Sequence, residues 1–196
     1  MLRKWFQRWQ ATTPDAASLY EAIVARARQP AFYALLDAPD TLMGRFQLLA
    51  LHVILVIDRL LGLAADAATD ETTRRQAREL ARLLQERMFD EMDAALREMG
   101  VSDLGVPKRM QKLAELFFGQ MRRYRAALAA NDARALQQAL ARNIYAELED
   151  AETAGAAAGA LAALVMQTHA VLTATPWRDL QAGRIDWPAI TEGEES

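Results

Sequence analysis

The sequence predicts an all-α protein, a single-domain bundle of about six antiparallel-packed helices with an irregular C-terminal tail. Hydrophobic residues make up 52% of the 196 residues and aromatic residues only 7%, so alanine and leucine, both strong helix formers, supply much of the apolar content. Apolar residues also recur in steps of three and four, which is the spacing of one helical face. Most of the six prolines and nine glycines stand near the ends of these periodic segments.

The first ten residues have the pattern of a short amphipathic helix. Its apolar face carries Leu2, Trp5, Phe6 and Trp9, and the flanking cations include Arg3 and Lys4. Such a segment can anchor a protein at a membrane surface, with its rings among the headgroups and its cations toward anionic lipid. A short helix packed on its own domain, or a frayed terminus, would show the same pattern.

Three helices are expected in the first half of the chain after this segment. Pro14 can start a helix, and Gln29-Pro30 ends it. Asp40-Thr41 can cap the next helix, and apolar residues continue at helical spacing from Thr72 to Met99, where Gly100 can end the third. The expected helices are therefore 14–28, 41–63 and 72–99, with a connecting turn at Phe32-Tyr33 and a polar loop at 66–72.

The clearest amphipathic helix runs from Val106 to Leu128. Its apolar stripe is Val106, Met110, Leu113, Phe117, Met121, Tyr124 and Leu128. Helices at 133–147 and 156–173 are expected to follow, and Pro176, Gly183 and Pro188 predict the irregular tail. The predicted organisation is a basic amphipathic segment at 1–13, a helical domain at 14–190 and a disordered tail at 191–196.

Two stretches, 48–57 and 155–175, are apolar enough to raise the question of a membrane span. The first is short and ends at Asp58-Arg59, and the second is alanine-rich with polar residues inside it. We interpret both as buried helices of a bundle. Since no secretory signal is visible, the predicted location is the cytoplasm, with peripheral contact to the cytoplasmic face of the inner membrane.

Residue types exclude several kinds of chemistry. The chain has no cysteine, so disulfides, thiolate nucleophiles and iron–sulfur ligation are absent. His52 and His169 lack metal-ligand spacing, and we expect a buried structural role for His52. The carboxylates at Asp90, Glu91 and Asp93 are expected to face water. We therefore predict no metal, no cofactor and no catalytic residue, and the net charge of −3 gives no reason to expect a DNA partner.

A basic stripe on the 106–128 helix is the most informative surface. Lys108, Lys112, Arg122 and Arg123 lie opposite Phe117 at about 100° per residue, and Arg109 lies on the flank. Such a stripe can bind acidic protein, phosphate or lipid, although it can equally be a solubilising face. We predict that Lys108, Arg109, Lys112, Arg122 and Arg123 form a partner-binding surface.

Several sequence blocks carry a resemblance to a known family. They are Leu19–Val24, Ala27–Pro30, Phe32-Tyr33, Gly44–Phe46, Leu51–Val53, Met92-Asp93, Leu96–Val101, Asp103-Leu104, Val106–Arg109, Phe117–Gly119 and Arg142-Asn143. Together these blocks resemble the ubiquinol–cytochrome c chaperone family, the assembly factors for respiratory complex III. The resemblance extends over most of the chain, and the chain looks like a bacterial-type member.

The resemblance implies an α-helical, non-enzymatic chaperone that binds newly made cytochrome b. It also implies two further candidate partners, the ribosome and a small helical protein, because mitochondrial members act with both. Five methionines on the helices 72–99 and 106–128 could line a groove for an apolar client or could simply fill the core. A carrier for quinone, lipid or haem is the alternative function, and it predicts a closed apolar cavity of a few hundred cubic ångströms.

Overall fold

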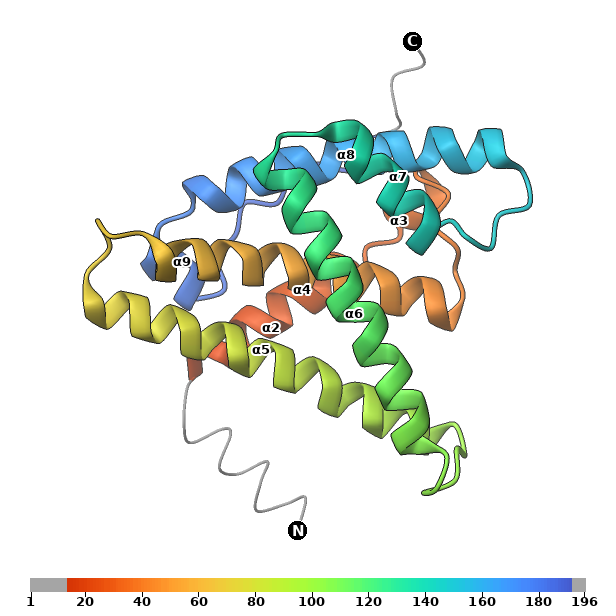
Figure 1. The fold of residues 1–196 in the computed structure, drawn as a ribbon, viewed down its shortest axis with the longest axis horizontal. Coiled ribbons are helices and arrows are strands. Elements are labelled where there is room, and N and C mark those ends of the chain that lie inside the picture. The colour runs from red at the N-terminus through yellow and green to blue at the C-terminus, as the bar shows by residue number, and fades with distance from the viewer. Residues whose placement is uncertain (1–13, 192–196) are drawn as a thin grey trace.

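The computed structural model describes residues 14–191, and these residues form an all-α fold without strands. Six helices are long and two are short (Figure 1). The long helices are α2 (Pro14–Ala27), α4 (Leu42–Ala65), α5 (Glu71–Glu98), α6 (Val106–Ala129), α7 (Ala133–Asn143) and α8 (Ala151–Ala174); the short ones are α3 (Ala31–Ala34) and α9 (Trp177–Gln181). The predicted fold class is confirmed.

Side-chain caps explain where four of the long helices begin. The side chains of Thr41, Asp70, Asp132 and Asp150 each accept a hydrogen bond from a backbone N–H in the first turn of α4, α5, α7 and α8. Each cap satisfies an amide that has no partner within its helix. The expected cap at Thr41 is confirmed.

Left-handed residues explain where α5 and α6 end. Gly100 has φ 77° and Asn131 has φ 49°, and each directly follows the C-cap residue of its helix, Met99 or Ala130. After α5, the N–H of Val101 donates to the carbonyl of Leu96, as in a Schellman motif. The chain thus turns sharply at both places, and the prediction that Gly100 ends its helix is confirmed.

Helix α4 is the centre of the fold and packs against α2, α5, α6 and α8. It runs antiparallel to α5, whereas α6 crosses both of them obliquely (Figure 1). Helix α7 packs against both α6 and α8. The arrangement therefore departs from a simple antiparallel bundle, because α6 lies across its neighbours rather than alongside them.

Helices α4 and α8 are each long and apolar enough to span a membrane by length and composition, with mean hydropathies of 2.1 and 1.5. In α4 the apolar side chains meet other helices on nearly every side, and 67% of its most apolar window is buried inside the protein. Burial against four neighbours accounts for the composition of α4 without a membrane. Helix α8 is less enclosed, and alanine supplies much of its exposed surface.

Three boundaries differ from those expected. Residues 31–34 form the short helix α3 where a turn was expected. Helix α7 ends at Asn143 rather than near residue 147, and α8 begins at Ala151 rather than near residue 156, since the carboxylate of Asp150 accepts the N–H of Thr153 and starts α8 early. These shifts leave a short connection between α7 and α8.

The C-terminal region is more structured than the predicted irregular tail. Residues 177–181 form α9, and Leu180 is fully buried. The indole of Trp187 lies 5.8 Å from the ring of His52 and covers the guanidinium of Arg26, also at 5.8 Å. Aromatic side chains thus tie this segment to the core, and the prediction of an irregular tail is wrong for α9.

Candidate functional site

The predicted basic face is exposed on α6. It consists of Lys108, Arg109, Lys112, Arg122 and Arg123. None of the five forms an ion pair or a side-chain hydrogen bond with another residue in the described range, whereas Arg125 on the same helix pairs with Asp58 at 2.6 Å. Cations without a partner inside the fold are free to bind an acidic partner without first breaking an ion pair.

The basic face is divided into two clusters. Lys108 and Arg122 are separated by about 21 Å along the axis at 1.5 Å per residue. Glu115 and Gly119 lie between them on the same side of the helix. A partner that contacts both clusters therefore has to extend over about four turns of α6.

Gly119 shapes the second cluster. A Cβ placed on this residue would lie 3.5 Å from Nη2 of Arg123, so the guanidinium folds back over the glycine one turn before it. The absence of a side chain at Gly119 lets the charge lie close to the helix surface. This contact gives a structural role to the glycine in the Phe117–Gly119 block.

A shallow hollow of about 350 Å³ between α6 and α7 extends the second cluster. Arg123 and Arg142 both line it, and its other lining residues are Ala126, Ala127, Ala130, Asp132, Ala135, Gln138 and Ala139. The amide of Asn143 donates to the hydroxyl of Tyr124 at 2.9 Å and fastens the end of α7 to α6. Arg142 is thereby placed across the hollow from Arg123.

Arg142 was not among the residues predicted for the basic face. It lies on a different helix, so the periodicity of α6 carries no information about it. The Arg142-Asn143 block was the available signal, because the asparagine makes the contact that positions its neighbour.

Exposed large apolar side chains are found in three places among the described residues. Leu42 and Met43 lie at the start of α4, Met99 and Leu104 at the α5–α6 turn, and Leu116 and Phe118 on α6. Leu42, 58% exposed, lines an open groove of about 620 Å³ with Tyr33, Phe46, Leu49 and Met92. Arg28 and Arg45 also line this groove, so it joins apolar and cationic surface.

The methionines of α5 and α6 have different environments. Met88 is fully buried, Met92, Met110 and Met121 are partly buried, and Met99 is 48% exposed. Met92 reaches the groove at the start of α4 and not a groove between α5 and α6. Most of these side chains therefore serve the core or its edges.

His52 is buried in the core of the described fold. Its Nδ1 lies 2.7 Å from the carbonyl oxygen of Leu48, and its ring meets the ring of Phe32 edge-on at 5.1 Å. Burial lowers the pKa of His52 to about 4, so the imidazole is neutral near pH 7. This environment confirms the expected structural histidine.

The acidic residues of α5 are engaged in separate contacts. Glu91 accepts a hydrogen bond from Tyr20 at 3.0 Å and pairs with Arg87, while Asp93 pairs with Arg97 at 2.6 Å. Desolvation raises the pKa of Asp90. Groups of three or more metal-ligating side chains do not occur in residues 14–191. The geometry supports binding at the basic face better than chemistry at these carboxylates.

The residues predicted to anchor the N-terminus, Arg3, Lys4, Trp5, Phe6 and Trp9, lie outside the described residues. The anchor stays a prediction. So does the assignment of 1–13 and 191–196 as separate segments.

Comparison with known proteins gives two matches. A family model described as ubiquinol-cytochrome C chaperone matches residues 34–187. A solved structure, the crystal structure of the Cbp3 homolog from Brucella abortus, is 37% identical over 97% of this chain and 98% of that one, with a TM-score of 0.76. No curated protein matches the chain.

Proposed function

The chain belongs to the ubiquinol-cytochrome C chaperone family, and we propose that it assists assembly of ubiquinol–cytochrome c reductase by binding newly made cytochrome b. The family supports the role in assembly, and the choice of cytochrome b is our inference. We infer also that the chain acts by binding and not by catalysis. The observation that carries this proposal is a cationic face that has no ion-pair partner among residues 14–191, on a fold that also exposes large apolar side chains.

A chaperone for a membrane protein has to hold apolar segments without aggregating itself. The groove at the start of α4 offers Leu42 and Leu49 to an apolar segment, while Arg28 and Arg45 keep its surroundings hydrated. The basic face of α6 offers charge to an acidic segment. Two separate surfaces of moderate size suit a client that must be released after it is handed on.

The basic face also suits the other partners expected from the family. A small acidic helical protein could dock along the alanine-lined hollow between α6 and α7, because alanines allow two helices to approach closely. Ribosomal phosphates could bind the same arginines. We propose a cytoplasmic location with peripheral contact to the inner membrane, which would place the chaperone where a membrane client emerges.

A carrier for quinone, lipid or haem is less well supported. It predicts an enclosed apolar cavity, whereas the hollows described in residues 14–191 are open to solvent. His52, which lies in the most apolar helix and would be the haem ligand of such a carrier, is packed between aromatic rings and lies 2.7 Å from the Leu48 carbonyl oxygen.

Affinity capture of the tagged full chain from membranes of its native host tests the proposal. Mass spectrometry of the captured material is expected to recover cytochrome b. Recovery of a bound small molecule, with no subunit of the reductase, would instead support the carrier and contradict the chaperone assignment.

A further inference from the structure

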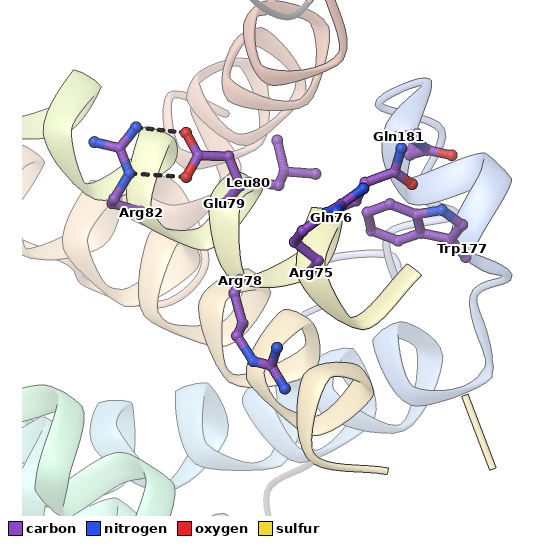
Figure 2. Close-up of a pocket in the computed structure, with 8 residues that line it drawn as sticks. All are labelled: Arg75, Gln76, Arg78, Glu79, Leu80, Arg82, Trp177 and Gln181. Atoms are coloured by element: carbon purple, nitrogen blue, oxygen red, sulfur yellow. Dashed lines mark hydrogen bonds and ion pairs between the residues drawn. The ribbon is translucent and has the colours of Figure 1, made fainter. Parts of the chain in front are cut away.

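A hollow of about 510 Å³ lies between α5 and α9, away from the basic face of α6. We name it the α5–α9 hollow, and its lining residues are Arg75, Gln76, Arg78, Glu79, Leu80, Arg82, Trp177 and Gln181. Leu80 is buried and lies at the apolar floor of the hollow, and the indole of Trp177 lies beside Gln76 and Gln181 (Figure 2). The hollow therefore combines an apolar surface, an aromatic ring and several cations.

Most of the charges around this hollow are already engaged. Glu79 pairs with Arg82, to which it is joined in Figure 2 on the side away from Trp177. Arg78 donates to the carbonyl of Ala64 at 3.0 Å and reaches toward Glu71. Arg75, by contrast, has no ion pair or side-chain hydrogen bond with another described residue. With Glu79 neutralised by Arg82, Arg75 supplies an uncompensated positive charge next to Trp177.

The hollow also lies close to the point where the chain enters the described fold. Gly183, just after α9, approaches α2 so closely that a Cβ there would lie 2.6 Å from the carbonyl oxygen of Ser18. Ser18 is one helical turn after Pro14, the first residue of α2. The described fold therefore begins, at Pro14, near the segment that follows α9.

We propose that the α5–α9 hollow binds the headgroup of an anionic phospholipid at a membrane surface. The guanidinium of Arg75 would hold the lipid phosphate, because its planar fork matches phosphate oxygens. The indole of Trp177 and the floor at Leu80 would contact the upper acyl region, where tryptophan is favoured. This inference rests on the peripheral membrane contact proposed above and names a site for it.

An anionic lipid fits the hollow better than an acidic soluble ligand. A single free guanidinium on a solvated surface holds a soluble anion weakly, whereas an anionic membrane presents many phosphates at once. A small polar anion would also leave the partly exposed indole of Trp177 in contact with water. The combination of one cation with an apolar wall matches an amphiphile.

Co-sedimentation of the full chain with vesicles tests the site. Vesicles of phosphatidylglycerol mixed with phosphatidylcholine are compared with vesicles of phosphatidylcholine alone. Arg75→Glu is expected to lower the partition coefficient onto the anionic vesicles roughly tenfold, because each basic residue near such a surface contributes severalfold. Arg75→Lys keeps the charge and is expected to retain most of the binding. Circular dichroism of each variant checks that the helices are unchanged.

Arg134→Glu is the matched control, since it makes the same charge change on an exposed residue of α7 that lines neither this hollow nor the one between α6 and α7. It is expected to leave vesicle binding within about twofold of the wild type. Equal losses for both variants would show general charge attraction and overturn the site. Unchanged binding by folded Arg75→Glu would overturn the site while leaving peripheral contact standing. Failure of the wild type to bind anionic vesicles would overturn both the site and the peripheral membrane contact. If Arg75→Glu binds vesicles as the wild type does but no longer captures a protein that the wild type captures by affinity, the hollow binds a protein and not a lipid.

Discussion

Replacement of Gly44 by alanine is expected to destabilise the fold, although alanine is ordinarily the better helix former. Gly44 lies in the first turn of α4, and its N–H donates to the hydroxyl oxygen of Thr41 at 3.0 Å. The chain before the cap folds back over this turn, so an added Cβ would lie 2.0 Å from the carbonyl oxygen of Pro39. The position of the added Cβ is fixed by the helix backbone, and the Pro39 oxygen is itself a backbone atom, so a change of side-chain rotamer cannot relieve the contact.

The size of the effect follows from two opposing terms. Alanine in place of glycine in a helix contributes about 0.8–1 kcal/mol to stability. Overpacking that forces the backbone to move costs about 1–3 kcal/mol and occasionally more. With a contact as close as this, we expect the upper part of that range and a net loss of about 1–2 kcal/mol. For a chain of this length that loss lowers Tm by about 2–8 °C.

Gly155→Ala is the matched comparison, because Gly155 is inside α8 and an added Cβ there would meet nothing within 4 Å. It is expected to raise Tm by about 1–4 °C. Thermal unfolding followed by circular dichroism measures both variants under the same conditions. A Gly44→Ala variant as stable as the wild type, or one that gains stability like Gly155→Ala, would refute the close approach of Pro39 to α4.

Two further perturbations test the interior. Burial lowers the pKa of His52 from 6.5 to about 4, so the unfolded chain binds the proton first, and the free energy of unfolding falls by on the order of 3 kcal/mol as the pH is lowered from 6.5 toward 4. Urea titrations across this range should show a smaller loss of stability for His52→Gln than for the wild type. An equal dependence of stability on pH in the two chains would contradict the burial of His52. Asp58 joins α4 to Arg125 at 2.6 Å and to His169 at 3.4 Å, so Asp58→Asn is expected to cost about 1–2 kcal/mol, whereas Asp93→Asn at an exposed pair should cost less than about 1 kcal/mol in the same urea assay. Equal costs would contradict the role of Asp58.

The long helices could be predicted from sequence because their cores repeat at helical spacing. The α6 stripe is an example: Val106, Phe117, Tyr124 and Leu128 are all buried as expected. The same periodicity placed the basic face correctly on the exposed side. It could not show that α6 crosses its neighbours, since crossing depends on contacts between helices such as the buried hydrogen bond from Gln120 to Gln47.

Short elements were harder to predict, because their stability comes from tertiary contacts. Helix α9 has five residues and one fully buried side chain, Leu180, which is too little for a periodic pattern. The α5–α9 hollow joins Arg75 to Trp177, residues about a hundred positions apart in the sequence. Nothing local to either residue indicates the other, so a site built by such a contact needs the structure.

Capture of cytochrome b by basic-face variants tests the proposed function most directly. The full chain is compared with Lys108→Glu/Lys112→Glu/Arg123→Glu and with the charge-conserving Lys108→Arg/Lys112→Arg/Arg123→Lys, each shown to be folded by circular dichroism. We expect the charge-reversed variant to recover cytochrome b at least roughly fivefold less well than the wild type, because like charges then face the acidic segment, while the charge-conserving variant recovers most of it. Equal recovery of cytochrome b by all three chains would contradict a client-binding role for the basic face, and absence of cytochrome b from the wild-type capture would contradict the proposed client.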